Sequence, residues 1–193
     1  MKIRLCIALW AGVVLLPAAQ PPAVDKVLHL FDELRSADTA RQAGRRQAVS
    51  FQLTDAEINE YMQYALKTTA RPGIESLAVK IFPKNYISTY TVVDFDAIER
   101  WKPGTVPTLL RPILTGRKSV WVDCRFLVSA GQATLSVEKA YYNNIPLPSF
   151  VVEKVISIVA AKQPEKYDTS KPLSLPFGLR SISTTDHAVT GQN

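Results

Sequence analysis

The chain has 193 residues, of which 47% are hydrophobic and 21% are charged, and its formal net charge is +6. This is the composition of an ordinary globular protein with enough apolar residues for one core. The basic excess is too small and too dispersed for a nucleic-acid-binding protein. It favours instead anionic surfaces such as lipid head groups or cell-wall polymers.

Residues 1–19 have the three-part layout of a secretory signal peptide. A basic start at residues 1–4 precedes an unbroken apolar run at residues 5–16, and small residues lead up to Ala19. The run has twelve residues, well below the about 20 that span a bilayer. We therefore expect export to the periplasm or the extracellular space. Pro17 makes the cleavage box imperfect, so an uncleaved anchor that holds the protein on the membrane is the less favoured alternative.

Cleavage after Ala19 would leave 174 residues, a length typical of a single domain. It would remove Lys2 and Arg4 and so lower the net charge from +6 to +4. Cys124 would then be the sole cysteine, and no intramolecular disulfide is expected. We divide the remaining chain into an N-terminal helix with a basic linker at residues 20–50, one domain at residues 51–184, and a flexible tail at residues 185–193.

Residues 23–46 are predicted to be helical, because apolar residues from Val24 to Leu34 recur at helical spacing. The second half of this segment is polar and basic, and it contains Arg35, Arg41, Arg45 and Arg46. We favour a solvated helix or linker for this half. The alternative is an electrostatic contact with an anionic surface.

The clearest local signal is a capping box, in which Thr54 starts a helix and Glu57 reaches back to it. The helix is predicted at residues 55–69. Its apolar face consists of Ile58, Tyr61, Met62, Ala65 and Leu66.

Four strands with alternating apolar residues follow, at residues 75–82, 86–95, 119–129 and 133–142. Strict alternation indicates an antiparallel sheet with one covered face. Between the second and third strands, residues 97–118 are rich in proline and glycine, so we expect a loop with at most a short helix at residues 108–114.

The most apolar segment after the predicted signal is residues 145–161. A helix with a wide face of valine and isoleucine is predicted at residues 149–162. A last short strand is predicted at residues 179–184. We therefore expect an α+β fold, with a curved antiparallel sheet of four to five strands packed by two amphipathic helices and an extra N-terminal helix.

Residues that could support catalysis are few. His29 and His187 lack partners at metal-ligand spacing, so neither a metal site nor a cofactor is expected. Asp94 and Asp96 could act as a carboxylate pair, but solvated acids at a strand end are the favoured interpretation. Asp186 and His187 resemble a fragment of a catalytic triad without a nucleophile in context. Together these residues favour a protein that is not an enzyme.

The remaining feature is apolar surface, which can be either a solid core or the lining of a ligand cavity. Periodicity does not distinguish the two. The candidate lining residues are Ile58, Tyr61, Met62, Leu66, Val93, Phe95, Val122, Phe126, Val152, Val155, Ile156 and Val159.

Two short motifs resemble the small secreted proteins related to the tubular lipid-binding superfamily. Residues 51–59, Phe-Gln-Leu-Thr-Asp-Ala-Glu-Ile-Asn, are similar to a Leu-Thr-x-x-Glu-Leu-Asn helix start, and residues 145–148, Ile-Pro-Leu-Pro, lead into an apolar helix as in that group. The resemblance implies a lipid held between a curved antiparallel sheet and a long helix, and it implies no catalytic residues. The insert at residues 103–112 has no counterpart in the resemblance.

These observations lead to two functional hypotheses. The first is a secreted or periplasmic protein that binds or carries a lipid-like hydrophobic ligand. The second is an envelope interaction module with a solid core, which meets an anionic membrane or an envelope polymer through its basic segment. A hydrolase that uses Asp94 and Asp96 is a weak third option.

Overall fold

The computed structural model describes residues 21–69, 72–106, 108–152 and 172–193. The predicted signal peptide at residues 1–19 therefore lies outside the described residues. The same holds for most of the predicted helix at residues 149–162, of which residues 149–152 are described and helical.

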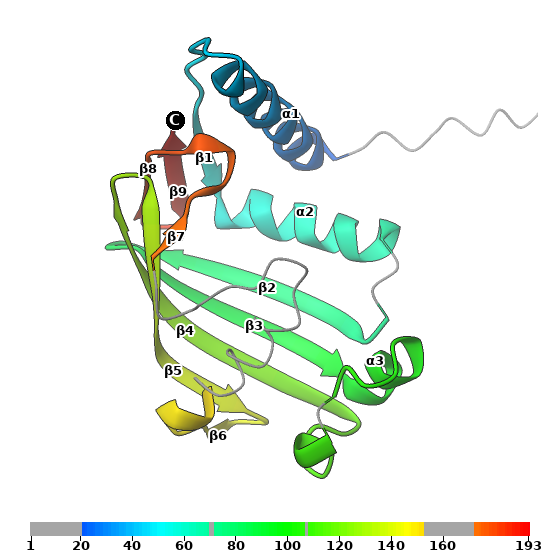
Figure 1. The fold of residues 1–193 in the computed structure, drawn as a ribbon. Coiled ribbons are helices and arrows are strands. Elements are labelled where there is room, and N and C mark those ends of the chain that lie inside the picture. Colours follow the sequence, from blue (N-terminus) through cyan, green and yellow to red (C-terminus); the bar gives the residue numbers. More distant parts are fainter. Residues whose placement is uncertain (1–20, 70–71, 107, 153–171) are drawn as a thin grey trace, which may run out of the picture.

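The fold is α+β, as predicted, and its sheets are antiparallel throughout (Figure 1). The helical elements are α1 (Pro22–Gln42), α2 (Asp55–Thr68), α3 (Phe95–Trp101), η1 (Thr108–Leu110) and η2 (Pro176–Gly178). The strands are β1 (Ser50–Thr54), β2 (Ile74–Phe82), β3 (Tyr86–Asp94), β4 (Arg117–Ser129), β5 (Gln132–Tyr142), β6 (Ile145–Pro146), β7 (Leu173–Ser174), β8 (Ser181–Thr185) and β9 (Ala188–Gln192). The larger sheet has the order β2-β3-β4-β5-β6, with β7 also on β5, and the smaller sheet has the order β1-β9-β8.

The predicted capping box is present at the start of α2. The Thr54 hydroxyl accepts a hydrogen bond from the Glu57 backbone N–H at 3.2 Å, and the Thr54 N–H donates to the Glu57 carboxylate at 2.8 Å. Lys26 of α1 also donates to this carboxylate at 2.6 Å. The hydrogen bond from Lys26, followed by that from Thr54, lowers the pKa of Glu57. The capping box therefore also connects α2 to α1.

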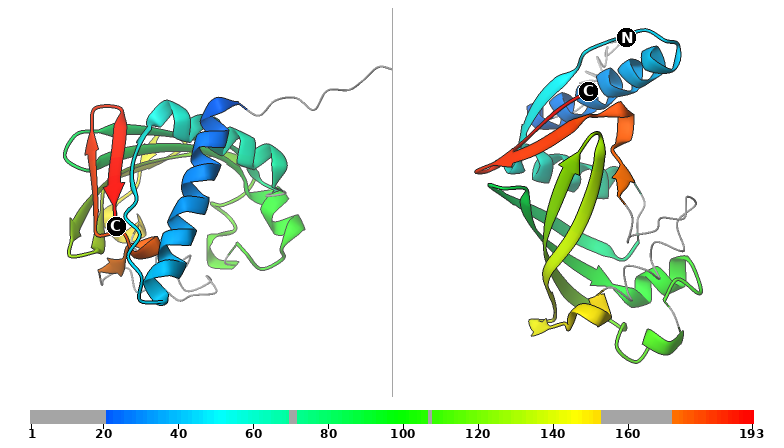
Figure 2. Two further views of the ribbon diagram at one scale, coloured as in Figure 1. Left: turned by 90° about the horizontal axis from the view of Figure 1, so that it is seen from above. Right: turned by 60° about the vertical axis from the view of Figure 1, so that its left-hand side comes forward.

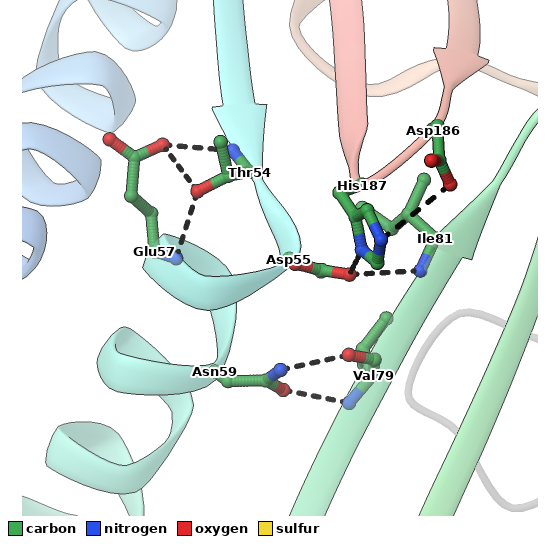
Figure 3. A network of polar contacts seen from close by, with 8 residues as sticks. All are labelled: Thr54, Asp55, Glu57, Asn59, Val79, Ile81, Asp186 and His187. Carbon is green, nitrogen blue, oxygen red and sulfur yellow. Dashed lines mark hydrogen bonds and ion pairs between the residues drawn. The ribbon is translucent and has the colours of Figure 1, made fainter.

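A polar side of α2 runs along the free edge of β2 (Figure 3). The Asn59 amide donates to the Val79 carbonyl at 2.8 Å and accepts from the Val79 N–H at 2.7 Å. Gln63, one turn later, donates to the Leu77 carbonyl at 3.2 Å. These side chains satisfy backbone groups that a neighbouring strand would otherwise take, so α2 protects the sheet edge from pairing with another chain.

The best-buried apolar cluster lies between α1 and the smaller sheet, which lie side by side in both views of Figure 2. Its buried members are Val27, Leu30, Leu34, Ala37, Val49, Leu53 and Leu179. Because four of these residues belong to α1, this helix is part of the core and not an accessory segment in front of it. Gly44, with φ +73°, lets the chain turn after α1, and the Arg45 N–H then bonds back to the Ala40 carbonyl at 2.9 Å.

The prediction of a flexible tail at residues 185–193 is wrong. Residues Ala188–Gln192 form β9, the central strand of the smaller sheet, which pairs with both β1 and β8. Its sequence, Ala-Val-Thr-Gly-Gln, holds too few apolar residues for a strand signal. The strand is stabilised instead by hydrogen bonds to two neighbouring strands and by packing of Val189 against the buried cluster around α1.

Two other boundaries differ from the predictions. The second strand ends at Asp94, and Phe95 begins α3 because the Asp94 carboxylate accepts a hydrogen bond from the Ala97 N–H at 2.9 Å. The helix Phe95–Trp101 therefore replaces the end of the predicted strand and the start of the predicted loop, whereas the helix expected at residues 108–114 is reduced to the 3₁₀ turn η1.

Candidate functional site

The strand register gathers apolar side chains on one face of the larger sheet, which we call the inner face. Leu77, Thr91, Val120 and Tyr142 lie opposite one another on β2 to β5, as do Val79, Thr89, Val122 and Ala140. Because side chains alternate between faces, the inner face consists of Ile74, Leu77, Val79, Ile81, Ile87, Thr89, Thr91, Val93, Lys118, Val120, Val122, Cys124, Phe126, Val128, Ala133, Leu135, Val137, Ala140 and Tyr142. The sequence predicted this alternation for β2, β3 and β4. In β5 simple alternation would have put Lys139 and Tyr141 with Leu135 and Val137, but the register shift at Asp123 and Cys124 brings Ala140 and Tyr142 to this face instead.

Apart from Thr89, Thr91 and Lys118 the inner face is apolar, yet most of it is only half-buried. Of its residues, Ile81 is 1% exposed and Ala140 is 5% exposed, whereas Leu135 is 51% exposed and the others fall between. The fully buried cluster of the described chain lies instead around α1. The inner face therefore differs from a closed core: it presents apolar surface that a ligand or another segment could cover.

The predicted lining residues separate into groups. Val93, Val122 and Phe126 share the inner face. Phe95 reaches one end of it from α3, with its ring centroid 6.3 Å from that of Tyr142. Val152 is buried, at 8% exposure. Val155, Ile156 and Val159 lie outside the described residues.

Two of the four α2 residues in the predicted lining pack against α1 and not on the inner face. Ile58 and Tyr61 pack against the α1 cluster, and the Tyr61 ring meets Phe31 edge-on at 5.7 Å between centroids. These two side chains therefore contribute to the core between α1 and α2. Met62 and Leu66 are half-buried.

The predicted basic group is brought together in part. Arg41, Arg45 and Arg46 line a depression of about 150 Å³ together with Arg180, which sequence reasoning did not single out. Arg35 does not line it and pairs with Asp32 of the same helix at 3.0 Å. Arg180 immediately precedes β8, so no local sequence pattern could have joined it to the end of α1.

The two aspartates near the end of β3 have structural partners. Asp94 caps α3, and Asp96 accepts hydrogen bonds from the Gly116 N–H at 3.0 Å and the Thr115 hydroxyl at 3.1 Å. These bonds, that from Gly116 first, lower the pKa of Asp96. Both carboxylates thus hold α3 and the following loop in place, which is what structural acids do.

A buried carboxylate on the opposite, outer face of the larger sheet was missed by sequence reasoning. Asp123 is 7% exposed and accepts a hydrogen bond from the Trp121 indole N–H at 2.8 Å. Burial opposes its ionisation, but hydrogen bonds from Ser88, Trp121 and Tyr86 still keep its pKa below the ordinary value. Burial, and then the bond to Asp123, raises the pKa of Tyr86 to about 12. The only sequence signal is an acid in mid-strand between Val122 and Cys124.

His187 lies in the turn between β8 and β9 and faces two carboxylates (Figure 3). Its Nδ1 is 2.8 Å from Asp55, which also receives the Ile81 N–H at 3.5 Å, and its Nε2 is 3.7 Å from Asp186. The hydrogen bond to Asp55, and then the charge of Asp186, raises the pKa of His187, while Lys80 opposes this shift. The histidine therefore joins the smaller sheet to the start of α2.

This contact predicts a pH-dependent contribution to stability. Because the pKa of His187 is higher in the folded state, the contribution is complete below about pH 6.5 and disappears as the pH rises through the raised pKa. Urea unfolding between pH 5.5 and 8.5 should show the wild type losing stability relative to His187→Gln as the pH rises. Parallel stability curves for the two proteins would contradict this role.

The described residues also bear on metal binding, on thiol chemistry and on membrane-spanning helices. Those residues contain no group of three or more His, Cys, Asp and Glu side chains that could hold a metal ion. Cys124 is a free thiol on the inner face, and burial raises its pKa. No helix within the described ranges is both long enough and apolar enough to cross a membrane.

The comparisons with known proteins gave no relative from which a function could be transferred. No protein-family model matches the chain, and a search of curated proteins found no match.

Proposed function

We propose that this protein is an exported, non-enzymatic protein that binds or carries a lipid-like hydrophobic ligand on the inner face of its larger sheet. One observation carries the proposal. The inner face is largely apolar from β2 to β5 but only half-buried, while the buried cluster of the described chain lies around α1. The resemblance of residues 51–59 and 145–148 to lipid-binding proteins points in the same direction.

The free energy of apolar surface in water favours a ligand that covers this face. Each 100 Å² of apolar surface left in water costs about 2.5 kcal/mol, so an apolar ligand gains affinity simply by covering it. Thr89 and Thr91 are the polar members in the middle of the face, and Thr89 already donates to the Val122 carbonyl at 3.2 Å. A ligand that fits there is dominated by hydrocarbon, such as an acyl or isoprenoid chain.

The ends of the inner face also suit an elongated ligand. At one end, α3 brings Phe95 against Tyr142, whose hydroxyl donates to the Ile113 carbonyl at 2.6 Å. At the other end, Leu135 is 51% exposed. A chain-like ligand could therefore lie with one end against Phe95 and the other near Leu135.

The experiment that tests this function is native mass spectrometry of the detergent-free protein, followed by organic extraction. We expect a bound mass that extracts as lipid. The alternative function, a solid-cored envelope interaction module, predicts the mass of the protein alone both as purified and after incubation with lipid.

A further inference from the structure

Four arginine side chains from three parts of the chain meet at one depression. Arg41 belongs to the last turn of α1, Arg45 and Arg46 to the connection that follows, and Arg180 to the residue before β8. The depression measures about 150 Å³, and Gly178 and Asn193 complete its wall. Its size suits a small ion or a head group.

The backbone around this depression is held in place. The Val49 N–H donates to the Asn193 side chain at 2.8 Å, and the Asn193 amide donates to the Gln47 carbonyl at 3.1 Å, which fixes the connection that carries Arg45 and Arg46. The Arg180 N–H donates to the Gln192 carbonyl at 2.8 Å. The arginines therefore lie on backbone segments that hydrogen bonds hold in place.

Arg41 is held as well. Its guanidinium bonds to Asp38 at 2.7 Å, and its side chain lies so close to Gly178 that a Cβ there would come within 2.6 Å of Arg41 Nε. Gly178, with φ +67°, thus admits the arginine to the wall of the depression.

The charges in this depression do not balance. Asp38 compensates Arg41, whereas Arg45, Arg46 and Arg180 make no ion pair within the described residues. The carboxyl end of α1 offsets only about half an elementary charge. Net positive charge therefore remains at the depression, and a bound anion would neutralise it.

We propose that this depression binds a phosphate group, preferably a phosphomonoester. A phosphomonoester carries about 1.5 to 2 negative charges at pH 7, which neutralises more of this positive charge than a carboxylate or a phosphodiester does. Arginine forks also match the oxygens of phosphate, with which they form paired hydrogen bonds. The group could be free phosphate or the head group of a lipid, and the site is separate from the inner face.

Two probes distinguish these sources. Inorganic phosphate is titrated calorimetrically against chloride at constant ionic strength, and vesicles of phosphatidylcholine with and without phosphatidate are tested by co-sedimentation. The variant is Arg45→Gln/Arg46→Gln/Arg180→Gln. The control, Arg35→Gln/Arg100→Gln/Arg117→Gln, removes the same charge from exposed arginines outside the depression.

We expect the variant to bind at least about tenfold more weakly than the wild type, because charge-assisted hydrogen bonds are lost, while the control keeps its affinity. Binding of inorganic phosphate with this pattern supports a site for the free anion. Binding only to phosphatidate vesicles with this pattern supports a head-group site. If neither probe binds, or if both variants lose binding equally, the proposal is overturned.

Discussion

Substitution of Thr91 by tryptophan is expected to abolish binding of an apolar ligand with little loss of stability. Thr91 is half-buried in the middle of the inner face, between Leu77 of β2 and Val120 of β4. An indole in this position would occupy the surface that the ligand covers. We expect the affinity for a fluorescent fatty acid to fall at least about tenfold, and the free energy of unfolding to change by less than about 1 kcal/mol.

The neighbouring residue supplies a matched control. Tyr90 points to the outer face and is 44% exposed, so Tyr90→Trp adds the same side chain to the same strand on the opposite side of the sheet. It should leave both binding and stability unchanged. If the inner face were instead a tight core, Thr91→Trp would lower stability by about 1–3 kcal/mol through overpacking, and wild-type protein would not bind the probe.

Substitution of Gly73 by alanine is expected to lower the free energy of unfolding by about 3 kcal/mol or more. Gly73 has φ +93°, which costs an alanine about 1–2 kcal/mol. A Cβ there would also come within 2.6 Å of the Asp94 carbonyl oxygen and 3.0 Å of the Ile98 nitrogen, both backbone atoms. Overpacking of this kind adds about 1–3 kcal/mol. Because α3 would have to move, its contact with one end of the inner face would be disturbed.

Gly104→Ala separates these two causes. Gly104 has φ +81°, but a Cβ there would meet no atom within 4 Å. Its substitution should cost only the backbone strain, about 1–2 kcal/mol. Equal losses in chemical denaturation of the two variants would contradict the close approach of α3 to Gly73.

The features that could be predicted from sequence are those in which local chemistry and fold agree. Thr54 and Glu57 specify their helix start within four residues, and the capping box forms as predicted. The alternation in β2 to β4 indicated which side chains share a face, because the period of a strand is two. In β5 the register shift at Asp123 and Cys124 breaks this period. The inner-face members Val93, Val122 and Phe126 follow from that alternation alone.

The features that could not be predicted depend on partners distant in the chain. β9 is stabilised by pairing with β1, which precedes it by more than a hundred residues, and its own sequence carries little strand signal. Arg180 joins the end of α1 through the same long-range arrangement. Asn59 gives no sign in the sequence that its amide will satisfy both backbone groups of Val79. The resulting position of α2 along the sheet edge leaves Ile58 and Tyr61 in contact with α1.

The most direct test of ligand binding on the inner face is native mass spectrometry of the wild-type protein in two states, as purified without detergent and after incubation with a mixed lipid extract. We predict a bound mass in at least one state, recovered as lipid by organic extraction and missing from Thr91→Trp. The mass of the protein alone in both states, or an adduct that Thr91→Trp retains in full, would contradict binding at the inner face.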